Sequence, residues 1–174
     1  MAKLVNFTVI DLPDLFAVGK VLQTNMAEVS KANPIPAFWD ACFTDGTFNQ
    51  IEKSSETLYN PDYIGLMYNY NAATGDFCYM CGMLLTKEYL PSSDFRSYHL
   101  EPIKTAISWI RGADTIEICS KAHDLSMKAI HDEGYDWANA AGWVIELYNC
   151  PRFTSPDSEG HLILDYYVPI QKSI

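Results

Sequence analysis

The stretch Trp143-Val-Ile-Glu-Leu-Tyr148-Asn repeats the pattern of an earlier one, Tyr63-Ile-Gly-Leu-Met-Tyr68-Asn, except that one apolar position has become charged. Both stretches are predominantly apolar and predict strands. Glu146 in the second copy stands where the first copy has Leu66. An unpaired charge is costly to bury, so a carboxylate in an apolar strand is usually paired, neutral, or held for a cationic or proton-sharing ligand. Glu146 is therefore the first candidate for a binding residue.

The elements predicted around these strands follow the same order in both halves of the chain. Each half begins with a strand that is kinked at a proline, Pro13 or Pro102, and continues with a helix and two further strands. The predicted strands are 5–10 with 15–22, 63–70, 77–85, 96–111, 143–150 and 161–170. The first predicted helix begins at Pro36, and the second is capped by Asp114 or Thr115 and runs to about Glu133.

Two β-α-β-β units of this size predict an α+β fold. We expect a single domain over residues 1–174, built from two pseudo-symmetric repeats at about 1–90 and 91–174. Their strands are expected to form one mostly antiparallel sheet, with both helices on one face and a ligand cleft between the repeats.

The composition excludes several classes of protein. A formal charge of −10 argues against direct nucleic-acid binding, which needs a basic face, and suits a cationic partner. No run approaches the roughly 20 apolar residues of a membrane span, and the N-terminus lacks a signal-peptide pattern. The five cysteines are scattered and odd in number, as for free thiols in a reducing compartment. We therefore expect a cytoplasmic protein that binds neither nucleic acid nor membrane.

No metal or cofactor site is predicted. Cys78 and Cys81 fall in a predicted strand, where residues three apart point to opposite faces. The four histidines lack the spacing of zinc ligands, and the sequence contains no phosphate-binding loop, nucleophile elbow or carboxylate dyad.

Side-chain alternation assigns faces in the strand around Glu146. Ile145 and Leu147 share one face, which we expect to pack against the helices, so Glu146 and Tyr148 point to the other face and the cleft. By the same parity Tyr68 points to the cleft, where facing tyrosines would form a slot for a flat aromatic ligand. A solvent-facing glutamate and ordinary sheet tyrosines are the alternative interpretation. A desolvated Glu146 is predicted to have a raised carboxyl pKa.

The segments Ile145-Glu-Leu-Tyr148 and Leu164-Asp-Tyr-Tyr-Val-Pro-Ile170 together resemble the closing signature of the GyrI-like superfamily. The segments Ile35–Trp39 and Gly75–Gly82 are similar to its first helix and first hairpin. The superfamily comprises effector-binding domains of AraC-type and MerR-type regulators, gyrase-inhibitory proteins and stand-alone small-molecule-binding proteins. The resemblance implies an aromatic-lined cleft in which a glutamate of the penultimate strand, here Glu146, neutralises lipophilic cations.

The resemblance also places Trp109 and Tyr167 on pocket-lining strands. Phe38 and Trp39 flank one turn of the first predicted helix, so one of them can lie in the core while the other reaches the cleft edge. No helix-turn-helix segment precedes the first strand, so we expect a stand-alone form. The predicted ligand-binding residues are Glu146, Tyr148, Tyr68, Phe38, Trp39, Trp109 and Tyr167.

Three functions follow as hypotheses. The first is binding of hydrophobic, aromatic or cationic small molecules, for sensing or sequestration. The second is hydrolysis of strained electrophiles such as cyclopropane-bearing genotoxins, as the resemblance implies for some stand-alone members. Glu146 would act as general base, and Tyr68 or Tyr148 as hydrogen-bond donor. The third is a protein-interaction role like that of the gyrase inhibitors.

Overall fold

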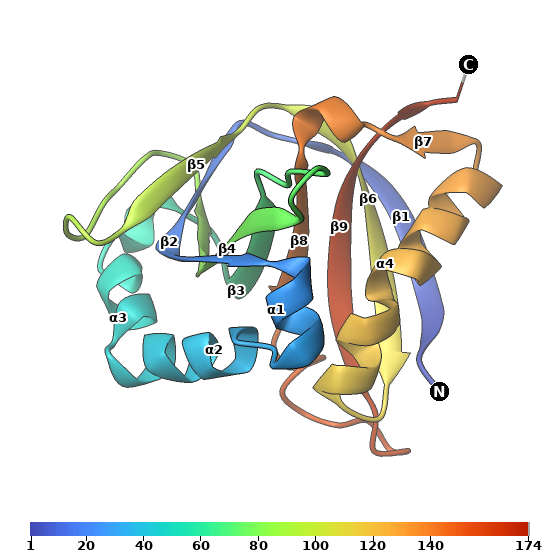
Figure 1. Ribbon diagram of the computed structural model, residues 1–174, viewed down its shortest axis with the longest axis horizontal. Coiled ribbons are helices and arrows are strands. Elements are labelled where there is room, and N and C mark those ends of the chain that lie inside the picture. Colours follow the sequence, from blue (N-terminus) through green and yellow to red (C-terminus); the bar gives the residue numbers. More distant parts are fainter. Residues whose placement is uncertain (174) are drawn as a thin grey trace. The chain divides into compact units, whose positions relative to one another are not determined.

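The computed structural model describes residues 1–173 and divides the chain into two compact units. The terminal unit comprises Met1–Pro13 together with the segment from Pro102 to the end of the described chain. The central unit comprises Asp14–Glu101. Both units combine antiparallel strands with helices (Figure 1), so the predicted α+β class and the mostly antiparallel arrangement are confirmed.

The terminal unit is an antiparallel sheet covered by one long helix. Its strands lie in the order β1-β6-β9-β8, and β7 pairs with the remaining part of β9. Helix α4 contacts β6, β9 and β1 (Figure 1). The elements are β1 (Lys3–Leu12), β6 (Ile103–Gly112), α4 (Thr115–Asp132), β7 (Tyr135–Trp137), η2 (Asn139–Ala141), β8 (Trp143–Tyr148) and β9 (Leu162–Lys172).

Helix α4 begins and packs as its sequence predicts. The Asp114 side chain accepts a hydrogen bond from the backbone N–H of Glu117 at 2.8 Å, which caps the helix. Gly112 makes room for the helix, because a Cβ at that position would lie 2.7 Å from the Ile118 side chain. Small and apolar residues of α4 are buried at regular helical spacing, namely Ile118, Ala122, Ser126, Ala129 and Ile130.

The central unit has the same plan with more helices. Its strands lie in the order β3-β4-β2-β5, all antiparallel, and α2 and α3 contact β2 or β4. Cys42, Phe48 and Ile51 from these helices join the hydrophobic core above β2 and β4. The elements are β2 (Leu15–Asn25), α1 (Met26–Lys31), α2 (Ile35–Thr44), α3 (Thr47–Glu52), η1 (Ser55–Thr57), β3 (Leu58–Tyr68), β4 (Asp76–Leu85) and β5 (Arg96–Leu100).

The two compact units do not coincide with the two halves of the sequence. β1 comes from the first half but pairs with β6 of the second, and β5 comes from the second half but pairs with β2 of the first. The chain passes between units at Pro13 and again at Pro102. A proline lacks the N–H that would continue a strand ladder, so both prolines stand where the pairing partner changes. The expected cleft between repeats stays a prediction.

The described residues contain neither a helix that could span a membrane nor a cluster that could bind a metal ion. None of their helices has the length and apolar character needed to cross a membrane. Residues 1–173 also contain no cluster of three or more His, Cys, Asp or Glu side chains arranged to hold a metal ion.

Candidate functional site

Glu146 lies in β8 of the terminal unit and is buried, with 8% of its surface exposed. The Tyr148 hydroxyl donates a hydrogen bond of 2.9 Å to the Oε2 atom of Glu146. Residues two apart on a strand share a face, and this contact confirms that the two side chains lie together. A buried carboxylate with a phenolic donor is therefore the centre of the site.

The Glu146 side chain points to the face of the sheet that α4 covers. Tyr166 lies directly opposite Glu146 in the strand register, and its hydroxyl is 3.2 Å from His123 on α4. Burial, and next the charge of Glu146, raises the pKa of the Cys119 thiol, which is also on α4. The prediction that Ile145 and Leu147 pack against the helices, with Glu146 on the opposite face, was therefore wrong. Alternation shows which residues share a face of a strand, but a helix can cover either face.

Two further side chains extend this cluster. Tyr166 of β9 lies directly opposite Glu146 in the strand register, and its hydroxyl is 3.2 Å from Nδ1 of His123 on α4. Burial, and then the charge of Glu146, raises the pKa of the Tyr166 hydroxyl well above its usual value. Cys119, Tyr166 and His123 were not predicted. The sequence feature that could have pointed to two of them is spacing: Cys119 and His123 are four residues apart, which places them on one face of a helix.

The Cys119 thiol offers a chemical test of the Glu146 charge. Burial, and next the Glu146 charge, raises the pKa of this thiol above its ordinary value. Replacing Glu146 with glutamine removes the charge, so the pH profile of Cys119 alkylation is expected to move to lower pH. Each pKa unit of displacement increases the thiolate fraction about tenfold at neutral pH.

The measurement is the rate of iodoacetamide labelling at Cys119 across pH, followed by mass spectrometry. The background carries Cys150→Ser, because Cys150 is exposed. Glu88→Gln removes the same charge from an exposed site in the central unit and serves as the control. An unmoved profile in the Glu146→Gln protein would contradict the arrangement.

Trp109 and Tyr167 lie on the other face of the terminal sheet. Tyr167 pairs with Ile145 and Trp109 pairs with Asp165, both out of phase with Glu146. The Arg152 guanidinium lies 4.2 Å from the centre of the Trp109 ring. The structure therefore does not bring these two aromatic residues to the side chain of Glu146.

Tyr68, Phe38 and Trp39 belong to the central unit. The Tyr68 ring lies 4.5 Å from that of Tyr98, and burial raises the pKa of Tyr68 to about 12. Trp39 donates its indole N–H to the Tyr79 hydroxyl at 3.0 Å, and both Phe38 and Trp39 pack against the core. The pairing of Glu146 as general base with Tyr68 as hydrogen-bond donor stays a prediction.

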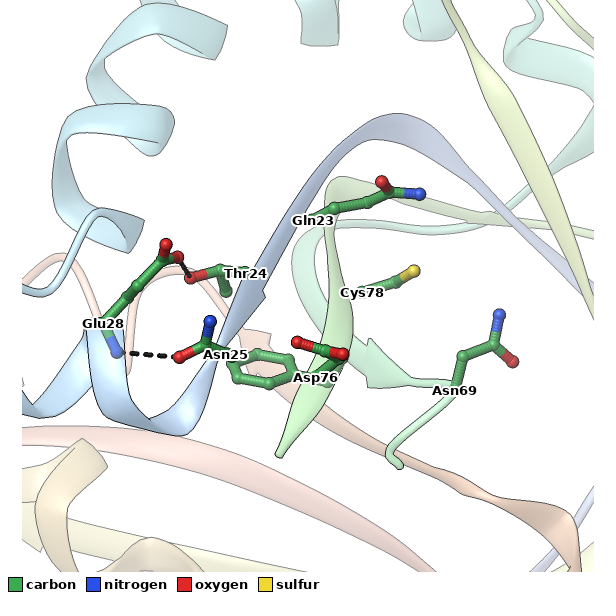
Figure 2. Close-up of a pocket in the computed structure, with 8 residues that line it drawn as sticks. Gln23, Thr24, Asn25, Glu28, Asn69, Asp76 and Cys78 are labelled. Carbon is green, nitrogen blue, oxygen red and sulfur yellow. Dashed lines mark hydrogen bonds between the residues drawn. The ribbon is translucent and has the colours of Figure 1, made fainter. Parts of the chain in front are cut away.

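The central unit also carries a pocket of about 380 Å³ that sequence reasoning missed (Figure 2). It lies where β2 ends and β4 begins, and polar side chains line it. These include the amides of Gln23 and Asn69 and the carboxylates of Glu28 and Asp76. A second pocket, of about 510 Å³, shares Gln23 and Asn69 with the first.

No model of a known protein family matches the sequence, and no curated protein matches it. Solved structures do resemble the fold over nearly the whole chain. SAV2435 bound to tetraphenylphosphonium has a TM-score of 0.67 and 15% identity, covering 96% of this chain and 94% of that one. The EcmrR C-terminal domain has a TM-score of 0.58 and 13% identity, covering 97% and 98%.

An integron cassette protein from Vibrio cholerae also resembles the chain, with a TM-score of 0.60 and 12% identity over 98% of this chain and 99% of that one. These identities are low, so the likeness concerns the fold. The chain thus shares its fold with a protein solved in complex with an organic cation and with the C-terminal domain of EcmrR.

Proposed function

We propose that this chain is a GyrI-like protein that binds hydrophobic organic cations, with Glu146 as the residue that meets the positive charge. The observation that carries the proposal is the buried Glu146 carboxylate beside the phenol of Tyr148 and opposite Tyr166. The complex of SAV2435 with tetraphenylphosphonium supports the ligand class, since that protein has the same fold.

The chemistry of this cluster suits a large, weakly hydrated cation. A delocalised cation is weakly hydrated, so its burial costs little hydration free energy. The cation also pairs with the buried carboxylate, which compensates for the desolvation of that carboxylate. The Tyr148 ring packs edge-on against Phe153, with 4.7 Å between the ring centres. Aromatic faces attract cations by about 0.5–2 kcal/mol each, so such rings add affinity for the same ligand.

The test is calorimetric titration with tetraphenylphosphonium of the wild-type protein and of Glu146→Gln. We expect saturable micromolar binding, on the order of −8 kcal/mol, which weakens at least tenfold in the variant. Glutamine keeps the size and an acceptor oxygen but removes the charge, so the loss measures the charge interaction.

Two controls make the result specific. Glu88→Gln removes an exposed carboxylate elsewhere and should bind like the wild type. Triphenylphosphine oxide, a neutral molecule with similar rings, should distinguish little between wild type and Glu146→Gln. Equal affinity of both proteins for the cation would refute the role of Glu146, and absence of binding would refute the proposed ligand class. The hydrolase and the gyrase-inhibitor-like roles stay predictions.

A further inference from the structure

The two pockets of the central unit adjoin one another and form a single polar groove. Gln23, Asn69 and Cys78 line both pockets, which makes them the middle of the groove. In Figure 2 the side chains of Gln23, Cys78 and Asn69 lie on the side of the pocket away from Glu28 and Thr24. The groove lies entirely within the central unit, on residues other than those of the Glu146 site.

One end of the groove is negatively charged. Glu28 and Asp76 line the first pocket. The Thr24 hydroxyl donates to Glu28 at 2.9 Å (Figure 2), and the Thr74 hydroxyl donates to Asp76 at 2.6 Å. Each hydroxyl orients one carboxylate while leaving it charged and accessible, so this end favours an ammonium group.

The opposite end carries a guanidinium. Arg96 lines the second pocket, and its NH1 group donates to the backbone carbonyls of Ser93 and Phe95 at 2.7 and 2.8 Å. Both bonds are made by NH1 and orient the guanidinium, whose planar fork matches the geometry of a carboxylate. Asp94 also lines this pocket; it is largely exposed, and it lies 3.3 Å from Lys20, which pairs more closely with Asp45 at 2.7 Å.

The space between the charged ends is lined by amides. Gln23 and Asn69 each present a donor and an acceptor, the groups that complement a peptide N–H and C=O. Asn69 holds a left-handed backbone conformation, with φ of 55°. Asparagine tolerates this conformation better than most residues.

We propose that this groove binds a short peptide with free termini, its ammonium group at Glu28 and Asp76 and its carboxylate at Arg96. In the register, Asp76 lies opposite Asn25 of β2 and Arg96 lies opposite Gly19. Asn25 and Gly19 are separated by roughly 20 Å along β2, at about 3.3 Å per residue, and the length of the Arg96 side chain covers part of this distance. A single amino acid is too short, whereas about three to five extended residues span the remaining distance.

The experiment uses tetra-alanine as the probe, with its N-acetylated and C-amidated derivatives, titrated by NMR against the 174-residue chain. The zwitterionic peptide is expected to shift the backbone resonances of Gln23, Asn69 and Cys78. Each blocked derivative should bind at least tenfold more weakly, because each has lost one terminal charge.

Substitutions assign each end of the peptide. In Arg96→Gln, tetra-alanine and its amide should bind equally, and in Glu28→Gln the difference between tetra-alanine and its acetylated form should shrink. Lys104→Gln, at an exposed lysine of the terminal unit, is the control and should bind like the wild type. Glu146→Gln should do so as well, which separates this site from the cation site.

Three outcomes would overturn the proposal. The first is equal binding of the free and blocked peptides, and the second is no shift of the groove resonances at millimolar peptide. The third is spermidine binding more tightly than tetra-alanine, which would assign the acidic end alone to polyamines.

Discussion

The Gly82→Ala protein is expected to lose the folded central unit. A Cβ at Gly82 would lie 2.0 Å from the carbonyl oxygen of Val18, and one at Gly19 would lie 2.1 Å from the carbonyl oxygen of Cys81. Gly19 and Gly82 are partners in the β2–β4 register, so the two strands approach where neither has a side chain on the facing side.

The atoms that would clash belong to the backbone, so no side-chain rotation relieves the contact. Val18 and Cys81 are fully buried, and separating β2 from β4 would disturb the core that α2 and α3 cover. We expect a loss of more than about 4 kcal/mol in the free energy of unfolding, large enough to unfold a marginally stable domain. Urea denaturation followed by far-ultraviolet circular dichroism measures this loss.

A second glycine distinguishes the clash from the general effect of adding a methyl group. Gly46 has φ of 74°, and a Cβ there would meet nothing within 4 Å. Gly46→Ala therefore carries only the cost of a left-handed backbone, about 1 kcal/mol. If Gly82→Ala is no less stable than Gly46→Ala, the close approach of β2 and β4 is not the constraint inferred here.

Much of the fold was predictable because its signals are local. Pro13 and Pro102 marked the breaks in the two long strands, and Asp114 marked the start of α4. The exchange of β1 and β5 between units was not predictable, because strand pairing is a long-range choice that alternation does not encode. The short helix α3 was also missed: α2 ends at Thr44, and a new helix begins at Thr47.

The candidate site was also predictable only in those features that the local sequence determines. Alternation along β8 correctly placed Tyr148 beside Glu146. The face on which they lie, and the approach of Cys119 from α4, depend on how the helix docks. Trp109 and Tyr167 were chosen for the strands that carry them, but their register places them out of phase with Glu146.

The Arg152→Ala protein is expected to be about 2–3 kcal/mol less stable than the wild type. The Arg152 NH2 group lies 2.7 Å from Oδ2 of Asp165, whose side chain is 5% exposed, against 30% for Arg152. Removing the cation leaves a charge in a buried position, which costs about 3–5 kcal/mol when both partners are fully buried. The partial exposure of Arg152 allows water to reach the site and lowers that cost.

Arg111→Ala is the matched control for this prediction, because it removes an arginine from the same unit. The partners of Arg111 are Asp157 and Glu159, which are 36% and 70% exposed, so the loss of these ion pairs should cost less stability than the loss of Arg152. Chemical denaturation at pH 7 measures both variants. Adding Asp165→Asn to Arg152→Ala should restore part of the lost stability, because no buried charge remains.

The ion pair between Arg152 and Asp165 also connects the stability of the terminal unit to the Glu146 site. Phe153 follows Arg152 in the chain, and its ring contacts Tyr148, the donor to Glu146. Losing the anchor at Arg152 should therefore loosen Phe153 and weaken tetraphenylphosphonium binding, whereas Arg111→Ala should leave binding unchanged. The destabilisation should also shrink as pH falls and the Asp165 carboxyl of the variant is protonated. A loss of stability in Arg152→Ala that persists unchanged at acid pH, or that Asp165→Asn does not relieve, would show that the buried charge is not its cause.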